Sequence, residues 1–173
     1  MGVAPVGPVP GRIGWKTAAM SSTIIVGTDG SDLALAAARQ GLSLLRPASL
    51  VMVVTVVFGL DPALAYDGSG HAGPSMTESE MLHQRERARH EGQDIVERTV
   101  AALGDVVEPA TVDTLVLEGG AGPALCELAE ELSAAAMVVG TRGRGGLKRA
   151  LLGSVSDHVV RNAACPVLVI NGS

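Results

Sequence analysis

Residues 134–160 read AAAMVVGTRGRGGLKRALLGSVSDHVV: an apolar run, a loop rich in glycine, arginine and lysine, and then a helical pattern. The apolar run AAAMVVG is typical of a buried strand, and SVSDHVVRNA at 154–163 predicts a helix. A strand followed by a loop and a helix predicts one βα unit of a parallel sheet. The glycine and basic residues of the loop raise the question of an anionic ligand.

The same alternation runs through the rest of the chain. Strands are predicted at 21–27, 49–58, 110–119, 134–140 and 165–170, and helices at 29–45, 78–103, 122–133 and 154–163. A long Gly- and Pro-rich loop is expected at 59–77. Alternating strands and helices predict one doubly wound α/β domain with a five-stranded parallel sheet and helices on both faces. We expect the Rossmann-like arrangement of such a sheet, with the strand order 3-2-1-4-5.

The helical periodicity also predicts which side chains face the core. Ser31 or Asp32 is expected to cap the first helix. The inward-facing residues are expected to be Leu33, Ala37, Ala38, Leu44 and Leu45 in the first helix, and Leu82, Ile95, Val96, Val100 and Leu103 in the second.

Composition narrows the class of protein. The chain has 173 residues, of which 47% are hydrophobic but only 2% aromatic, so we expect a core of Ala, Val and Leu. The net charge of −5 argues against general binding to nucleic acid or anionic membranes. No apolar run approaches the ~20 residues of a membrane-spanning helix. We expect residues 1–21 to be a flexible N-terminal extension without a signal peptide, and residues 22–173 to form the domain.

Cysteine and histidine usage argues against a zinc site or a redox motif. Neither cysteine, Cys126 or Cys165, belongs to a CxxC pair, which favours a reducing, cytoplasmic setting. The four histidines do not show metal-ligand spacing on one helix face. We expect surface positions for them.

The predicted carboxyl ends of the strands carry the unusual chemistry. Ligands of open α/β sheets bind at this edge, near the switch in strand order. Gly140 and Gly143 permit a close backbone approach to an anion, and the helix beginning near Gly153 offers free N–H groups and a favourable dipole. Ser154 is expected either to cap that helix or to donate its hydroxyl to a phosphate. The nearby basic residues are Arg142, Arg144, Lys148 and Arg149.

Two standard phosphate motifs are absent. The P-loop pattern GxxxxGK[ST] does not occur, and GxGxxG fails because residue 148 is lysine. The spacing Gly140-x2-Gly143-x9-Gly153-Ser154 instead resembles the G-x2-G-x9-G-[S/T] motif of the universal stress protein family, in its ATP-binding branch. IIVGTDGS near the start and CPVLVI near the end are also similar to that family. The resemblance covers about residues 22–171.

The resemblance implies a role for each matching residue. Asp29 would lie against the adenosine, the Val56 backbone would face the adenine, and Val139 and Gly140 would border the ribose. The triphosphate cradle would comprise Gly143, Gly153, Ser154 and Val155, and the remaining candidate binding residues are Thr28 and Arg142. This sequence departs from the family in having Thr55 where members often have histidine. The family also implies a homodimer through the last strand, at Val167, Leu168, Val169 and Ile170.

The leading functional hypothesis is a nucleotide-dependent regulatory or stress-response protein. It would bind ATP, with Mg²⁺, show little or no turnover, and act on an unidentified regulatory partner protein. An alternative is a slow ATP hydrolase or phosphotransfer enzyme, and another is a cAMP-binding member of the family. Fast phosphoryl transfer needs a positioned base and metal-binding carboxylates together, and only Asp29 is evident as a metal ligand. A phosphoacceptor receiver domain is excluded, because the second strand does not end in the aspartate it needs.

Overall fold

A computed structural model of the chain describes residues 22–45, 48–57, 77–141, 143 and 152–171. In chain order the elements are β1 (Thr23–Gly27), α1 (Asp32–Leu44), β2 (Leu50–Val57), α2 (Glu78–Leu103), the short 3-10 helix η3 (Gly104–Val107), β3 (Thr111–Glu118), α3 (Ala121–Glu131), β4 (Ala136–Gly140), α4 (Ser154–Asn162) and β5 (Val167–Ile170). Each predicted strand and helix is present, whereas η3 was not predicted. The expected extension 1–21 lies outside the described residues, as does the expected loop up to residue 76.

The sheet has the predicted architecture. Its five strands lie in the order β3-β2-β1-β4-β5, and every neighbouring pair is parallel. β1 lies at the centre, where Val26 pairs with Val53 of β2 on one side and with Val138 of β4 on the other. The chain order reverses between β1 and β4, which is where an open parallel sheet leaves a crevice at its carboxyl edge.

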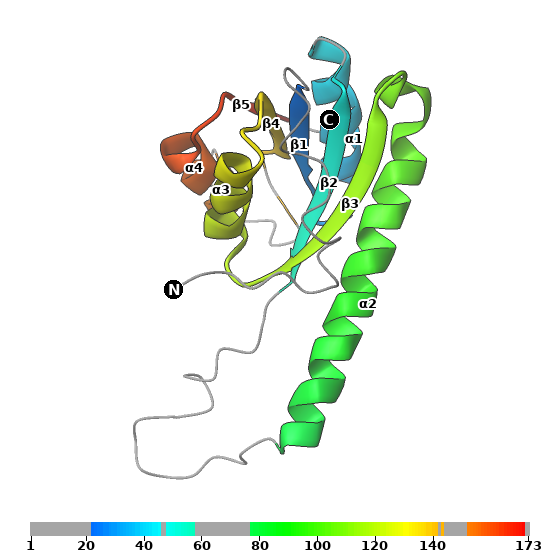
Figure 1. The fold of residues 1–173 in the computed structure, drawn as a ribbon, viewed down its shortest axis with the longest axis vertical. Helices are drawn as coiled ribbons and strands as arrows, with labels where there is room; N and C mark the ends of the chain where they lie inside the picture. Colours follow the sequence, from blue (N-terminus) through cyan, green and yellow to red (C-terminus); the bar gives the residue numbers. More distant parts are fainter. Residues whose placement is uncertain (1–21, 46–47, 58–76, 142, 144–151, 172–173) are drawn as a thin grey trace.

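Two helical layers cover the sheet, as Figure 1 shows: α1 and α2 lie on one face, α3 and α4 on the other. Each face has its own apolar cluster. The cluster beneath α1 and α2 includes Ile24, Val26, Val51, Val53, Val96, Leu103 and Val138. The cluster beneath α3 and α4 includes Ile25, Met52, Val54, Leu125, Leu128, Met137 and Val159. The core is therefore aliphatic, as the composition predicted.

Three leucines expected in the core are instead exposed. Leu33 and Leu44 of α1 are 46% and 66% exposed, and Leu82 of α2 is 57% exposed. The buried face of α1 consists of small residues, such as Ala37 and Gly41, together with Leu42. Small residues let the helix lie close to the sheet, and this close approach turns Leu33 and Leu44 outward. The prediction was correct for Ala37 and Ala38, which are buried, and wrong for Leu33 and Leu44, which lie at the margin of the buried face.

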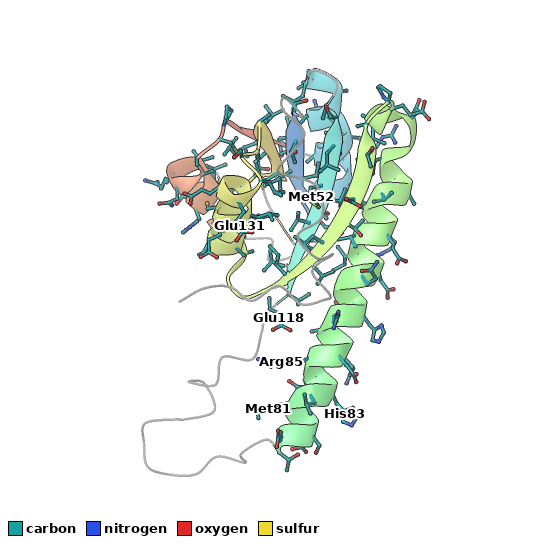
Figure 2. The ribbon with its side chains drawn as sticks, in the orientation of Figure 1. Met52, Met81, His83, Arg85, Glu118 and Glu131 are labelled. Carbon is teal, nitrogen blue, oxygen red and sulfur yellow. The ribbon has the colours of Figure 1, made fainter. Side chains whose placement is uncertain are left out.

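Leu82 is exposed because α2 is longer than the sheet it covers. The buried residues of α2 begin only at Gly92 and continue with Ile95, Val96, Thr99 and Leu103. The earlier part extends past the carboxyl edge of the sheet: in Figure 2, Met81, His83 and Arg85 lie beyond Glu118, the last residue of β3. Within the described part of the chain, no helix is long and apolar enough to cross a membrane, α2 included.

A capping box closes the projecting end of α2. The Glu80 N–H donates to the Thr77 hydroxyl (3.3 Å), while the Thr77 N–H donates to a Glu80 carboxylate oxygen (2.7 Å). The Thr77 backbone N–H, and then its hydroxyl, hold the pKa of Glu80 below its ordinary value of 4.5. Because little tertiary packing supports this end of the helix, its order depends on the cap.

Candidate functional site

A cavity of about 330 Å³ opens at the carboxyl edge of the sheet, between the ends of β1 and β4. The predicted site residues that line it are Thr28, Asp29, Val56, Val139, Gly140, Gly143, Gly153, Ser154 and Val155. Arg142 lies outside the described residues, as do Arg144, Lys148 and Arg149. The β1, β2 and β4 ends thus meet at one place, although they are far apart in the sequence. The cavity falls within the size range of small-molecule sites.

The loop between β1 and α1 positions the carboxylate of this cavity. Oδ1 of Asp29 accepts hydrogen bonds from the Ser31 N–H (3.0 Å) and the Ser31 hydroxyl (2.7 Å). Ser31 is also the N-cap of α1, where its side chain accepts from the Ala34 N–H (3.3 Å). The cap predicted at Ser31 is therefore present. The same serine fixes both the helix start and the Asp29 side chain.

The segment between β4 and α4 is tied together at its two ends. The Ser156 hydroxyl donates to the carbonyl of Gly140 (2.6 Å), and the Gly153 N–H donates to the carbonyl of Thr141 (2.7 Å). Ser156 is buried, with 3% of its surface exposed. These two bonds hold the start of α4 beside the end of β4, so that Gly140 and Gly153 border the same cavity.

Ser154 does not cap α4, which was one of the two roles expected for it. Gly153, not Ser154, is the N-cap, and no side chain caps the helix. Ser154 is the first helical residue, and its side chain is exposed. The first N–H groups of a helix lack intrahelical acceptors, and the helix dipole places partial positive charge there. This end of α4 is therefore suited to an anion.

Gly143 is in close contact with Asp29. A Cβ added at Gly143 would lie 2.7 Å from Oδ2 of Asp29, closer than real Cβ atoms approach an oxygen. Asp29 is itself held by Ser31. A side chain at position 143 would have to displace this carboxylate, which gives a steric reason for glycine there.

The inner wall of the cavity is apolar. Its apolar residues include Val54, Ala121, Leu125 and Leu152, and Gly27, Thr55 and Ser156 also line the cavity. Of these residues, the sequence analysis named only Thr55, as the position where family members often have histidine. Ala121 lies just after the end of β3. It could have been predicted as a lining residue, because the carboxyl ends of all parallel strands meet at one edge of the sheet. Leu125 and Ser156 carried no such signal, because their positions depend on how α3 and α4 pack. An apolar wall with a few polar groups is typical of a site for a ligand with a flat, weakly polar part.

Ionisable groups are scarce among the described residues that line the cavity. Among the described lining residues, Asp29 has the only ionisable side chain. No group of three or more His, Cys, Asp or Glu side chains that could hold a metal ion occurs in the described ranges. The arrangement offers one carboxylate, several backbone N–H groups, two hydroxyls near α4 and an apolar wall. Such a set of groups is suited to binding a ligand that has an anionic end and an apolar end.

Comparison of the sequence with protein families gives one match that spans most of the chain. Residues 20–171 match the model of the universal stress protein family. Universal stress protein MJ0531 of Methanocaldococcus jannaschii is 32% identical over 147 residues, which cover 85% of this chain and 80% of that protein. Several mycobacterial universal stress proteins also match. This chain spans about half of their length, for example 47% of Rv2624c of Mycobacterium tuberculosis, at 32% identity.

Solved structures share the fold. Universal stress protein UspA from Lactobacillus plantarum superposes with a TM-score of 0.69 at 20% identity, covering 88% of this chain and 99% of that one. A universal stress protein solved in complex with cAMP has a TM-score of 0.53 at 27% identity, covering 88% of this chain and 98% of that chain.

Proposed function

The chain belongs to the universal stress protein family, and on this basis we propose that its strand-end cavity binds ATP together with Mg²⁺. The protein would hold the nucleotide with little or no turnover and act as a nucleotide-dependent stress-response regulator. The observation that carries the proposal is the placement of Asp29, Gly143 and the uncapped start of α4 around one cavity with an apolar wall.

The two ends of the cavity suit the two ends of an adenine nucleotide. The base would pack against Val54, Val56 and Leu125, with the Val56 backbone supplying hydrogen bonds to its edge. The phosphates would lie at the start of α4, where free N–H groups and the helix dipole favour negative charge. The Ser154 hydroxyl, which does not cap the helix, is available to donate to a phosphate oxygen.

Mg²⁺ would be held mainly by the nucleotide. Mg²⁺ keeps several water ligands and commonly uses one or two carboxylates together with substrate phosphates. Asp29 is the one carboxylate among the described lining residues, and it is the residue through which the chain would contact the ion. A single carboxylate and the absence of a base among these residues support slow or absent turnover.

A homodimer would form through β5, the edge strand of the sheet. The carbonyls of Pro166 and Ile170 accept hydrogen bonds from Met137 and Thr141 at β4. Because backbone groups alternate along a strand, those of Val167 and Val169 face the free edge. A second copy pairing there would cover an unpaired edge, which proteins seldom leave open. We expect Val169→Pro to shift the protein from dimer to monomer in sedimentation velocity, since proline removes one edge donor and is tolerated at an edge.

The experiment that tests nucleotide binding begins with the purified protein. After denaturation, released nucleotides are separated by chromatography. ATP binding to nucleotide-free protein is then measured by calorimetry with and without Mg²⁺, and phosphate release is followed in parallel. Bound adenine nucleotide, or saturable binding of ATP, supports the proposal. If no nucleotide is released and ATP shows no saturable binding, the proposal is refuted. Phosphate release well above background that Asp29→Ala abolishes would favour the hydrolase instead.

A cyclic nucleotide is the second candidate ligand. The relative solved with cAMP is 27% identical to this chain across 98% of its own length. Competition between cAMP and ATP in the same calorimetric assay distinguishes the two ligands. A lower Kd for cAMP than for ATP with Mg²⁺ would assign the site to the cyclic nucleotide, and the regulatory role would then follow cAMP.

A further inference from the structure

A buried hydrogen-bond chain connects α2 with the loop that carries Asp29. The Gly30 N–H donates to the Thr28 hydroxyl oxygen (3.1 Å), and the hydroxyls of Thr28 and Thr99 lie 3.3 Å apart. The Thr99 hydroxyl donates to the Ile95 carbonyl (2.8 Å). Since a hydroxyl has one proton, Thr99 accepts from Thr28. The chain therefore runs in one direction, from Gly30 through Thr28 and Thr99 to Ile95.

The two threonine hydroxyls of this hydrogen-bond chain are buried, whereas the bond from Gly30 is partly buried. Thr99 is 0% exposed and Thr28 is 9% exposed. The Thr28 hydroxyl is thus committed to the interior, so Thr28 borders the cavity without presenting a free hydroxyl to it. Burying a hydroxyl without a partner is costly, which makes Thr99 the group on which the orientation of Thr28 depends.

The loop also packs directly against α2. Gly30 has a φ of +73°, a left-handed conformation that favours glycine. A Cβ at Gly30 would lie 3.1 Å from Ile95 and 3.4 Å from the guanidinium of Arg98. The turn therefore sits on the same stretch of α2 that contributes Thr99, and α2 fixes it from behind.

We propose that Thr99 is a positioning residue for nucleotide binding, although α2 contributes none of the described lining residues of the cavity. Its hydroxyl orients Thr28 and Gly30, and the turn that they form holds Asp29 at the cavity, where Ser31 donates to it. This inference rests on the proposed function, since it concerns the same ligand. It adds a determinant of affinity on a helix that does not contact the ligand.

The test compares four proteins: the wild type, Thr99→Val, Thr99→Ser and Val96→Ala. Valine keeps the shape of threonine but removes the acceptor, whereas serine keeps the hydroxyl. Val96 is fully buried on the same helix but makes no side-chain hydrogen bond. Its truncation therefore controls for a general loss of stability. Each protein is examined for ATP affinity by calorimetry, for melting temperature, and for amide exchange of Gly30 and Ser31 by NMR.

We expect Thr99→Val to raise the Kd for ATP by about three- to tenfold, the equivalent of one buried hydrogen bond. It should also speed amide exchange at Gly30. Thr99→Ser should bind within about twofold of the wild type, and Val96→Ala should bind ATP normally despite a lower melting temperature.

Two results overturn the inference while leaving nucleotide binding intact. One is an unchanged Kd in Thr99→Val, and the other is an equal loss of affinity in Val96→Ala. If the wild type binds no adenine nucleotide, the proposed function fails, and so does the assignment of Thr99 to nucleotide binding. The exchange at Gly30 then still reports separately whether Thr99 holds the turn.

Discussion

Substituting alanine for Gly143 tests the geometry of the candidate site most directly. The added Cβ would lie 2.7 Å from Oδ2 of Asp29 and must displace either the carboxylate or the backbone at position 143. The carboxylate is the end of a side chain, but it is not free to move, because Ser31 donates to it from its N–H and its hydroxyl. The substitution therefore forces residue 143, which follows β4, against Asp29, which follows β1, and one of the two must move.

The size of the effect follows from those two hydrogen bonds. A hydrogen bond to a charged group contributes about 1.5–3 kcal/mol. Asp29 is half-buried, so water can replace part of each hydrogen bond that is lost. If ATP needs Asp29 in its present position, binding must restore both bonds, at a cost of about 1–2 kcal/mol, which corresponds to a rise of roughly five- to thirtyfold in the Kd for ATP.

Calorimetry on nucleotide-free protein measures this effect, and the chain offers a matched control. A Cβ at Gly120, just after β3, would meet only Pro123 at ordinary contact distance, 3.6 Å. Gly120→Ala should therefore leave the Kd unchanged. In an Asp29→Ala background, Gly143→Ala should cost little, because the clashing oxygen is gone. A Kd for Gly143→Ala equal to that of the wild type, or an undiminished effect without Asp29, would refute the steric reasoning.

Three further predictions concern stability. Arg39 donates to the carbonyls of Ala102 and Leu103 at the end of α2, so Arg39→Ala should lower the free energy of unfolding by about 1 kcal/mol; an unchanged urea midpoint would contradict this. Gly92→Ala places a Cβ 2.6 Å from a Val116 methyl, and overpacking should outweigh the helix-propensity gain, for a net loss of about 1 kcal/mol in urea unfolding. The lowered pKa of Glu80 means that its capping stabilisation is complete above its ordinary pKa and is lost as pH falls through the lowered value. Thr77→Ala should raise that pKa part of the way towards 4.5, because only the backbone donor remains, and a carboxyl titration by NMR that shows no rise would contradict it.

The sequence allowed the fold to be predicted because its strong signals are local. Short apolar runs rich in valine identified the strands, and their alternation with helices predicted a parallel sheet covered on both faces. The exposure of Leu33 and Leu44 follows from a stripe of mostly small residues. The buried residues Ala34, Ala37, Ala38, Gly41 and Leu42 have helical spacing, and Leu33 and Leu44 lie at the margin of the face they form. Because most of these residues are alanine or glycine, the stripe is a weak hydrophobic signal in the sequence.

The candidate site was predictable to a similar extent. Motif spacing identified Gly143 and Gly153, and the strand ends identified Asp29, because each is a property of a short segment. Thr99 could not be found in this way, since it meets Thr28 across 71 residues of sequence. Ser156 was missed for a related reason: its bond to Gly140 requires α4 to lie beside the end of β4.

Thr141 connects the candidate site with the edge strand β5, because it is hydrogen-bonded to both. Its carbonyl accepts from the Gly153 N–H at the start of α4, and its own N–H donates to the carbonyl of Ile170 in β5. A ligand shifts a conformational equilibrium only by contacting its two states differently. A phosphate bound as proposed would contact the segment that includes Gly153, and a displacement of Gly153 must move Thr141 or break its bond to it. A nucleotide-dependent change at the proposed dimer edge would therefore need no long path through the core, because the single residue Thr141 separates the start of α4 from β5.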